Sequence, residues 1–207
     1  MFVRATTIHA DLAKLDEGVA FVRDSVVPAV ATLPGSLGLT MMVDRQTGTT
    51  SVSTAWETEQ ARADADEVLT SLRAKASRLM GGGTPVTELF ELVAMDRLRP
   101  AQAGFWSRVT RVTIPPADVD DAIDAYTSSI VHDLRLLDGY CSAVLLVDRA
   151  KGVGAVIVTF DSRKHVEATR DQAAAIRRTG LEKAGAEIGE VREAEIVIAG
   201  LRLPQTG

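Results

Sequence analysis

Three side chains have the types that proton transfer and small-molecule binding require: His9, Trp56 and Tyr126. Histidine changes charge near neutral pH, so His9 is a candidate general base. Trp56 offers a flat surface for a planar ligand, and Tyr126 lies on the apolar face of an expected helix, where a buried hydroxyl needs a partner. Each also has a structural interpretation, as a solvated strand end (His9) or as core residues (Trp56, Tyr126). We therefore treat the three as candidates for catalysis.

Two arginines recur at equivalent places, Arg4 and Arg108, each two residues before a threonine. Arginine is rarely buried without a partner. One interpretation is a cross-strand ion pair in each half, Arg4 with Glu91 and Arg108 with Glu195. The other is contact with an anionic ligand. Together with two aromatic residues at strand ends, the candidate pocket residues are Arg4, Trp56, Arg108 and Phe160.

The remaining motifs argue against a metal or phosphate site. His9, His132 and His165 fall on three separate expected elements, and none has the spacing of a metal site. Gly81–Gly83 lacks the Lys-Ser/Thr ending of a phosphate loop and follows a helix, where a phosphate loop follows a strand. We expect neither a metal ion nor a cofactor.

The chain contains the same unit twice. A shift of 104 positions aligns residues 1–98 with residues 105–203 without a gap, and seven of the 26 positions in 33–58 are identical in 137–162. The matched segments include Val43-Asp44-Arg45 with Val147-Asp148-Arg149 and Trp56-Glu57-Thr58 with Phe160-Asp161-Ser162. The sequence therefore predicts two domains, 1–98 and 105–203, joined by a linker at 99–104.

Each half is predicted to run strand, helix, strand, strand, helix, strand. The first helix carries apolar residues at steps of three and four, which places them on one face. The five-residue link Asp44–Gly48 and its copy Asp148–Gly152 end in glycine and predict hairpins with a positive-φ residue. In the first half the strands are expected at about 2–9, 37–43, 50–56 and 86–95, with helices ending near 33 and 80; in the second half the strands are expected at about 107–114, 141–147, 155–160 and 191–199.

The middle strands are apolar on both alternations, for example at Val144, Leu145, Leu146 and Val147. Two helices cover only one face of a four-stranded sheet, so the other apolar face needs a second cover. The simplest cover is the sheet of the other half. The sequence therefore predicts an α+β fold, in which two tandem ferredoxin-like βαββαβ halves pack sheet to sheet as an intrachain dimeric α+β barrel.

At this point the chain resembles a known family. The pattern Leu33-Pro34-Gly35, then Asp44–Gly48, then Trp56-Glu57-Thr58 at the strand-to-helix junction is similar to that of antibiotic biosynthesis monooxygenase-like domains, which belong to the dimeric α+β barrel superfamily. The resemblance covers both halves and implies a barrel that two chains normally form, here made from one. It implies a cavity between the sheet and the helices of each unit.

The resemblance implies a cofactor-independent monooxygenase that acts on an aromatic or polyketide-like small molecule. The chain departs from the family in having no asparagine, although family members place Asn near the pocket. An alternative function is a stress-related or small-molecule-binding barrel without turnover. A second alternative is a haem protein, because some superfamily members ligate iron through a helix histidine, here His165. We expect the functional pocket in the first half, which holds His9 and Trp56.

The amino-acid composition limits the classes of binding partner that we expect. The chain has 207 residues, 23 basic and 28 acidic side chains and a net charge of −5, and nucleic-acid binding favours a basic face instead. No apolar run approaches the roughly 20 residues that cross a bilayer, and no secretory signal is visible. The one cysteine, Cys141, fits a reducing cytoplasm. We expect a cytoplasmic protein with a small-molecule ligand, as a monomeric pseudo-dimer or a homodimer.

Overall fold

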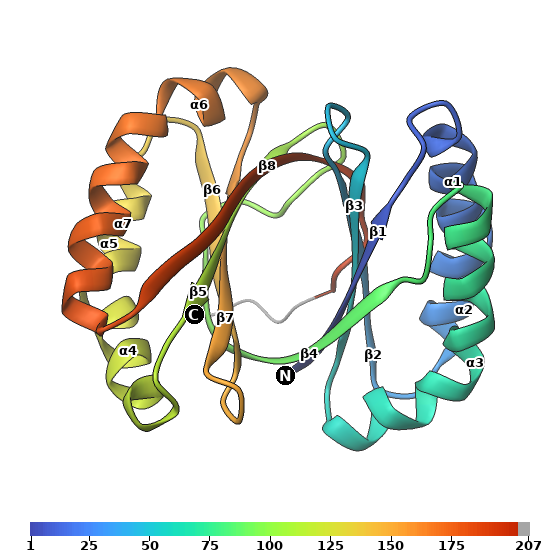
Figure 1. Cartoon of the computed structure of the whole chain (residues 1–207), viewed down its shortest axis with the longest axis horizontal. Coiled ribbons are helices and arrows are strands. Elements are labelled where there is room, and N and C mark those ends of the chain that lie inside the picture. Colours follow the sequence, from blue (N-terminus) through green and yellow to red (C-terminus); the bar gives the residue numbers. More distant parts are fainter. Residues whose placement is uncertain (203–207) are drawn as a thin grey trace. The chain divides into compact units, whose positions relative to one another are not determined.

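The computed structural model of the chain describes residues 1–202, apart from the side chains of residues 181–184 (Figure 1). It confirms the α+β class and the repeated order of elements. The first half contains β1 (Phe2–His9), α1 (Leu15–Phe21), η1 (Val22–Val26), α2 (Val27–Thr32), β2 (Ser36–Val43), β3 (Thr49–Trp56), α3 (Glu59–Leu79) and β4 (Val86–Arg97). The second contains β5 (Trp106–Thr113), η2 (Pro116–Asp118), α4 (Val119–Ala125), η3 (Tyr126–Ile130), α5 (Val131–Arg135), β6 (Tyr140–Asp148), β7 (Val153–Phe160), α6 (Arg163–Ala168), α7 (Arg170–Ala184) and β8 (Glu187–Ala199).

All strand pairs are antiparallel where the register is defined. Hydrogen-bonded neighbours follow the order β1-β3-β2-β8-β5-β7-β6-β4, which closes into a barrel. Contacts divide the described chain into two compact units, one made of residues 1–89 with 196–202 and the other of residues 90–195. Both dividing points fall inside strands, β4 and β8, so each of these strands contributes to both units.

In each unit the helices lie on one face of the sheet (Figure 1), and the core lies between them. Trp56 and Leu69 are buried in the core of the first unit. Phe160 and Tyr126 are buried in the core of the second. The periodic apolar residues predicted for the first helix of each half also pack in these two cores, as expected.

That first helix contains a π-helical turn in both halves, η1 in the first and η3 in the second. The turn is continuous with the α-helical segments on either side, because the flanking residues keep helical backbone angles. Single π turns inside α-helices are frequent at functional sites. In the second half this turn begins at Tyr126 and ends at Ile130.

The predicted hairpins are confirmed. Gly48 and Gly152 close the two turns with φ of 73° and 61°, a conformation that L-residues with a side chain rarely adopt. The second helix of each half begins at an equivalent cap: Thr58 accepts a hydrogen bond from the N–H of Ala61 at 3.1 Å, and Ser162 accepts one from His165 at 3.3 Å. No helix in the described part of the chain has both the length and the apolar composition to span a membrane.

Candidate small-molecule site

A cavity of about 70 Å³ lies in the second unit, between the helices and the sheet. A space of this size exceeds the roughly 10–15 Å³ that one water molecule requires. Its wall is almost entirely apolar, with Val112 from β5, Leu145 from β6, Val158 from β7 and Ile176 from α7 among the lining residues. Apolar cavities with a few converging polar groups are the usual form of small-molecule sites.

Tyr126 brings a hydroxyl to this cavity. Its side chain lines the wall and is 3 % exposed. The hydroxyl has no hydrogen-bond partner among the residues that the structure describes. Burial, and then the negative charge of Asp96, raise the pKa of Tyr126, so the phenol stays protonated and can donate a hydrogen bond. The cavity therefore holds an unused donor on the π turn.

Arg108 on β5 lines the same cavity and is 2 % exposed. Its Nε and Nη2 donate to the carboxylate of Glu193 on β8 at 3.1 and 3.0 Å, and Nη2 also donates to the carbonyl of Val166. Its Nη1 is buried without a hydrogen-bond partner in the described part of the chain. The flat guanidinium also lies 5.4 Å from the ring centre of Phe160. Arg108 is thus held rigidly, with one nitrogen left over.

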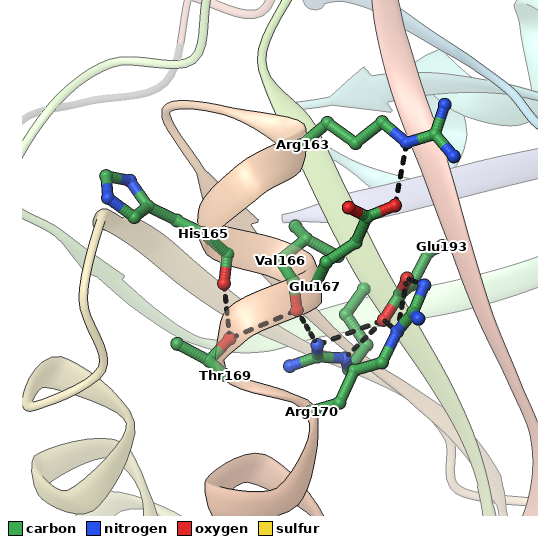
Figure 2. A network of polar contacts seen from close by, with 8 residues as sticks. Arg163, His165, Val166, Glu167, Thr169, Arg170 and Glu193 are labelled. Atoms are coloured by element: carbon green, nitrogen blue, oxygen red, sulfur yellow. Dashed lines mark hydrogen bonds and ion pairs between the residues drawn. The ribbon is translucent and has the colours of Figure 1, made fainter.

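Glu193 also accepts hydrogen bonds from Arg170, the shortest at 2.6 Å from Nη2. Figure 2 shows these two side chains pointing toward each other beside α6, which carries Val166. Burial alone would raise the pKa of Glu193, but the hydrogen bonds from Arg170 and Arg108 lower it. Glu193 therefore stays ionised and is shared between two arginines.

Arg177 is a lining residue that the sequence argument missed. It lies on α7 and is half-buried, and it makes no hydrogen bond or ion pair with any residue that the structure describes. The repeat contained a signal for it, because the shift of 104 positions places Arg177 on Arg73, just as it places Arg108 on Arg4. A lone basic residue on a helix does not distinguish its position from others, whereas an arginine that recurs at the same place in both halves does.

The two halves differ at the positions that line the cavity. Leu69 of the first half is buried in its core, whereas its counterpart Ala173 lines the cavity. Met80 packs so closely on Gly18 that a Cβ there would lie 2.1 Å from Met80 Cγ. The counterpart of Gly18 is Ala122, which lines the cavity. The smaller side chain of Ala173 on α7 therefore leaves space where Leu69 fills the first half.

The candidates expected in the first half lie elsewhere. His9 is exposed at the end of β1, with Nδ1 3.4 Å from the hydroxyl of Thr49. Trp56 is fully buried, and its indole Nε1 donates to Thr54 Oγ1 at 3.1 Å, so its polar atom is satisfied inside the core. Neither residue lines the cavity of the second unit. The cavity thus lies in the half opposite to the expected one.

Both predicted arginine–glutamate pairs are wrong. Arg4 pairs with Asp66 on α3 at 3.0 Å, and Glu91 pairs with Arg149 at 2.9 Å. Arg108 pairs with Glu193, because the register of β5 and β8 sets these residues opposite each other and sets Glu195 opposite Trp106.

The other histidines and the cysteine do not join the cavity. His132 is exposed. His165 is partly buried: it packs on Gly139, and its Nδ1 lies 2.5 Å from Asp161. Cys141 is buried as a free thiol, and burial raises its pKa. Among the side chains of residues 1–180 and 185–202, no group of three or more His, Cys, Asp or Glu residues could hold a metal ion.

The chain is similar to two proteins of Mycobacterium tuberculosis along nearly its whole length. It is 40 % identical over 205 residues to "Uncharacterized protein Rv2557", covering 99 % of this chain and 91 % of that protein. It is 34 % identical over 206 residues to "Uncharacterized protein Rv2558", covering 99 % and 87 %. No protein-family model matches the chain.

Solved structures match across both halves. A proposed monooxygenase from Lactobacillus acidophilus has a TM-score of 0.70 and 9 % identity over 97 % of this chain and 96 % of that chain. An anthrone oxidase-like protein has a TM-score of 0.67 and 16 % identity over 99 % and 96 %. A ferredoxin-fold protein from Listeria monocytogenes, related to antibiotic biosynthesis monooxygenases, has a TM-score of 0.53 and 8 % identity over 94 % of each chain. At these identities the likeness establishes the fold.

Proposed function

Because the chain belongs to the family of the Mycobacterium tuberculosis proteins Rv2557 and Rv2558 and has the fold of antibiotic biosynthesis monooxygenases, we propose that it is a monooxygenase-like protein whose second half binds a small apolar substrate. The observation that carries this proposal is the cavity itself, with apolar walls and the polar groups of Tyr126, Arg108 and Arg177. The repeat supports the related proposal that two monooxygenase-type units are fused in one chain.

The proposed reaction needs no metal. An enolisable ring CH₂ loses a proton to solvent water, and the resulting carbanion is oxidised by O₂, which bonds to that carbon. The ring carbon loses its second proton and becomes C=O, while the outer oxygen atom takes up two protons and leaves as water. The positive charges of Arg108 and Arg177 favour the ionised substrate, and the neutral hydroxyl of Tyr126 donates to its oxygen anion. These residues supply electrostatic stabilisation, and the substrate and O₂ supply the redox chemistry.

Binding without turnover is the second candidate function. It is favoured by a specific feature of the wall: none of the described lining residues is a carboxylate or a histidine, so none serves as an ordinary general base. A binding protein needs the cavity and its donors alone. The two functions therefore share a site and differ in whether O₂ is consumed.

The test uses anthrone, a tricyclic ketone with an acidic ring CH₂, in air-saturated buffer. We expect oxygen uptake and quinone formation faster than the spontaneous reaction. Ala173→Leu, which introduces the residue that the first half carries, should abolish the acceleration by filling the cavity. Ala174→Leu makes the same change at an exposed position of the same helix and should leave it intact.

Native mass spectrometry and titration separate the candidates. Anthrone that binds to the 22.1 kDa chain, is excluded by Ala173→Leu and is not oxidised would support the binding function and overturn the oxygenase. No binding to either protein, or equal rates in the wild type and Ala173→Leu, would overturn the cavity as the functional site. The same spectra give the oligomeric state.

A further inference from the structure

Positive charge is in excess at one end of the cavity. Three arginines gather around a single carboxylate: Arg108 and Arg170 both bind Glu193, and Arg177 lies close enough for its charge to act on both Arg108 and Glu193. The nearby carboxylate of Glu167 is paired with Arg163 at 2.8 Å. Among the side chains that the structure describes, one carboxylate outside that pair, that of Glu193, therefore faces three arginines.

One of these arginines, Arg108, is almost fully buried, which costs free energy because the ion loses its contact with water. Arg108 is 2 % exposed, and its Nη1 lacks a partner within the described chain. A buried ion with an unsatisfied donor carries a desolvation penalty unless something compensates it. Both burial and the like charge of Arg108 lower the pKa of Arg177. Within the described residues, a buried donor of Arg108 without a partner and the guanidinium of Arg177 thus lie on the same cavity.

In the first half a carboxylate on α3 pairs with both equivalent arginines, although Nε of Arg4 is likewise buried without a hydrogen-bond partner in the described part of the chain. Arg73, the counterpart of Arg177, pairs with Asp66, which also pairs with Arg4, the counterpart of Arg108. The shift of 104 positions places Arg170 where Asp66 stands, so the second half has a positive residue at the neutralising position. The cavity therefore lies in the half whose equivalent of Asp66 is not a carboxylate.

We propose that Arg108 and Arg177 form an anion-binding end of this cavity, so that its ligand is a small apolar molecule carrying one ionised acid group, a carboxylate or an enolate. This inference rests on the proposed site and names its substrate class. The acid group of the ligand accepts hydrogen bonds from Arg108 Nη1 and from the guanidinium of Arg177. The apolar body of the ligand fills the space along Val112, Leu145 and Val158, and Tyr126 donates the remaining hydrogen bond.

Two probes of the same shape test the charge. 2-Naphthoate is ionised at neutral pH, and 2-naphthamide is its neutral isostere. Fluorescence titration should give a dissociation constant for the naphthoate on the order of 10- to 100-fold lower, because hydrogen bonds to charged groups are the strong ones. Ala173→Leu should weaken both probes and so report that both occupy the cavity.

Variants on α7 test whether Arg177 is the residue that binds the anion. Arg177→Gln should reduce the preference for the anion to a few-fold while naphthamide binding is unchanged, and Arg177→Lys should restore part of it. Arg178→Gln removes the same charge from the next, exposed position and should preserve the preference. Equal binding of the two probes by the wild type would overturn the anion site and leave the cavity site standing.

A preference that survives Arg177→Gln would overturn the assignment to this arginine. If neither probe binds, or if Ala173→Leu weakens neither, both this inference and the proposed cavity site fail. Each outcome thus distinguishes the substrate class from the location of the site.

Discussion

The hydroxyl of Tyr126 is buried without a hydrogen-bond partner among the described residues, so the ligand-free protein should be more stable without it. An unsatisfied buried polar group costs about 1–3 kcal/mol. We expect Tyr126→Phe to raise the free energy of unfolding by about 1 kcal/mol, measured by urea denaturation. Tyr140→Phe is the matched control with the opposite sign, because the Tyr140 hydroxyl donates to Asp96 at 2.6 Å. A loss of stability in Tyr126→Phe would contradict the prediction.

Asp96 should make the stability of the chain depend on pH in the acid range. Its carboxylate accepts a hydrogen bond from Arg135 Nε at 2.8 Å as well as the one from Tyr140, and the pKa of Asp96 is lowered, chiefly by Arg135 and against the effect of burial. A carboxyl group whose pKa falls on folding stabilises the native state above its unfolded pKa, about 3.9, and loses that contribution as pH falls through the folded value.

We therefore expect Asp96→Asn to lower the free energy of unfolding by about 1–3 kcal/mol at pH 7, toward the lower end because Arg135 is partly exposed. The difference from the wild type should shrink below about pH 4. Asp133→Asn, an exposed carboxyl on α5, should change little. Denaturation curves at several pH values measure both, and a difference that stays constant down to pH 2 would refute the assignment.

Residue types were easier to predict than partners. Arg108 and Tyr126 stood out because a charge on a strand and a hydroxyl on an apolar helix face conflict with burial. The partner of Arg108 was misplaced by two residues, since Glu193 and Glu195 point to the same side of β8 and alternation does not distinguish them. Register is fixed by strand pairing and by the irregularity between Thr110 and Val112, which the pattern does not contain.

At the scale of elements, glycine at a positive φ is required for two separate reasons: the strain of the backbone and the crowding of a Cβ atom. Gly152 has a φ of +61°, and a Cβ there would lie 2.0 Å from the carbonyl oxygen of Ile114. Gly185 has nearly the same φ, +60°, with nothing within 4 Å of its would-be Cβ. Comparing alanine substitutions at the two positions separates backbone strain from crowding.

We expect Gly185→Ala to cost about 1–2 kcal/mol, the strain of an L-residue in the left-handed region. Gly152→Ala should cost clearly more, because the backbone carbonyl of Ile114 has to move as well. Thermal or chemical unfolding of both variants gives the comparison. Equal losses would show that the turn relaxes without cost and that φ alone selects glycine there.

Element order was predictable because the apolar pattern repeats with the period of each element, and the gapless repeat tested every assignment twice. The π turns were not predictable, since residues such as Val22 and Val26 fit the steps of an α-helix equally well. The cavity was not predictable either. It arises from small differences between equivalent core residues, such as Leu69 and Ala173, that leave the pattern of apolar positions unchanged.

At the scale of the whole molecule, the repeat predicts two domains, 1–98 and 105–203, and the contacts divide the described chain inside β4 and β8. Ile198 packs in the core of the first unit, and the N–H of Gly200 donates to the carbonyl of Leu39 at 2.8 Å. Phe90 is buried in the second unit, and β4 pairs with β6 from Glu91 onward. A sequence repeat identifies equivalent segments but leaves open which unit each strand end completes.

Because each unit contains a strand end from the other half of the sequence, we expect the two halves to fold poorly when separated and well when combined. Cutting the chain in the segment 99–104 gives one fragment that lacks Ile198 and the backbone partner of Leu39, and another that lacks the β4 residues that pair with β6. Each fragment then exposes an unpaired strand edge and loses buried apolar surface.

We expect neither fragment alone to unfold cooperatively, whereas a one-to-one mixture should recover a cooperative transition and migrate as one complex. Circular dichroism and size-exclusion chromatography of the fragments and their mixture measure this. A fragment 1–98 that unfolds cooperatively as a monomer would show that the strand end from the other half is dispensable.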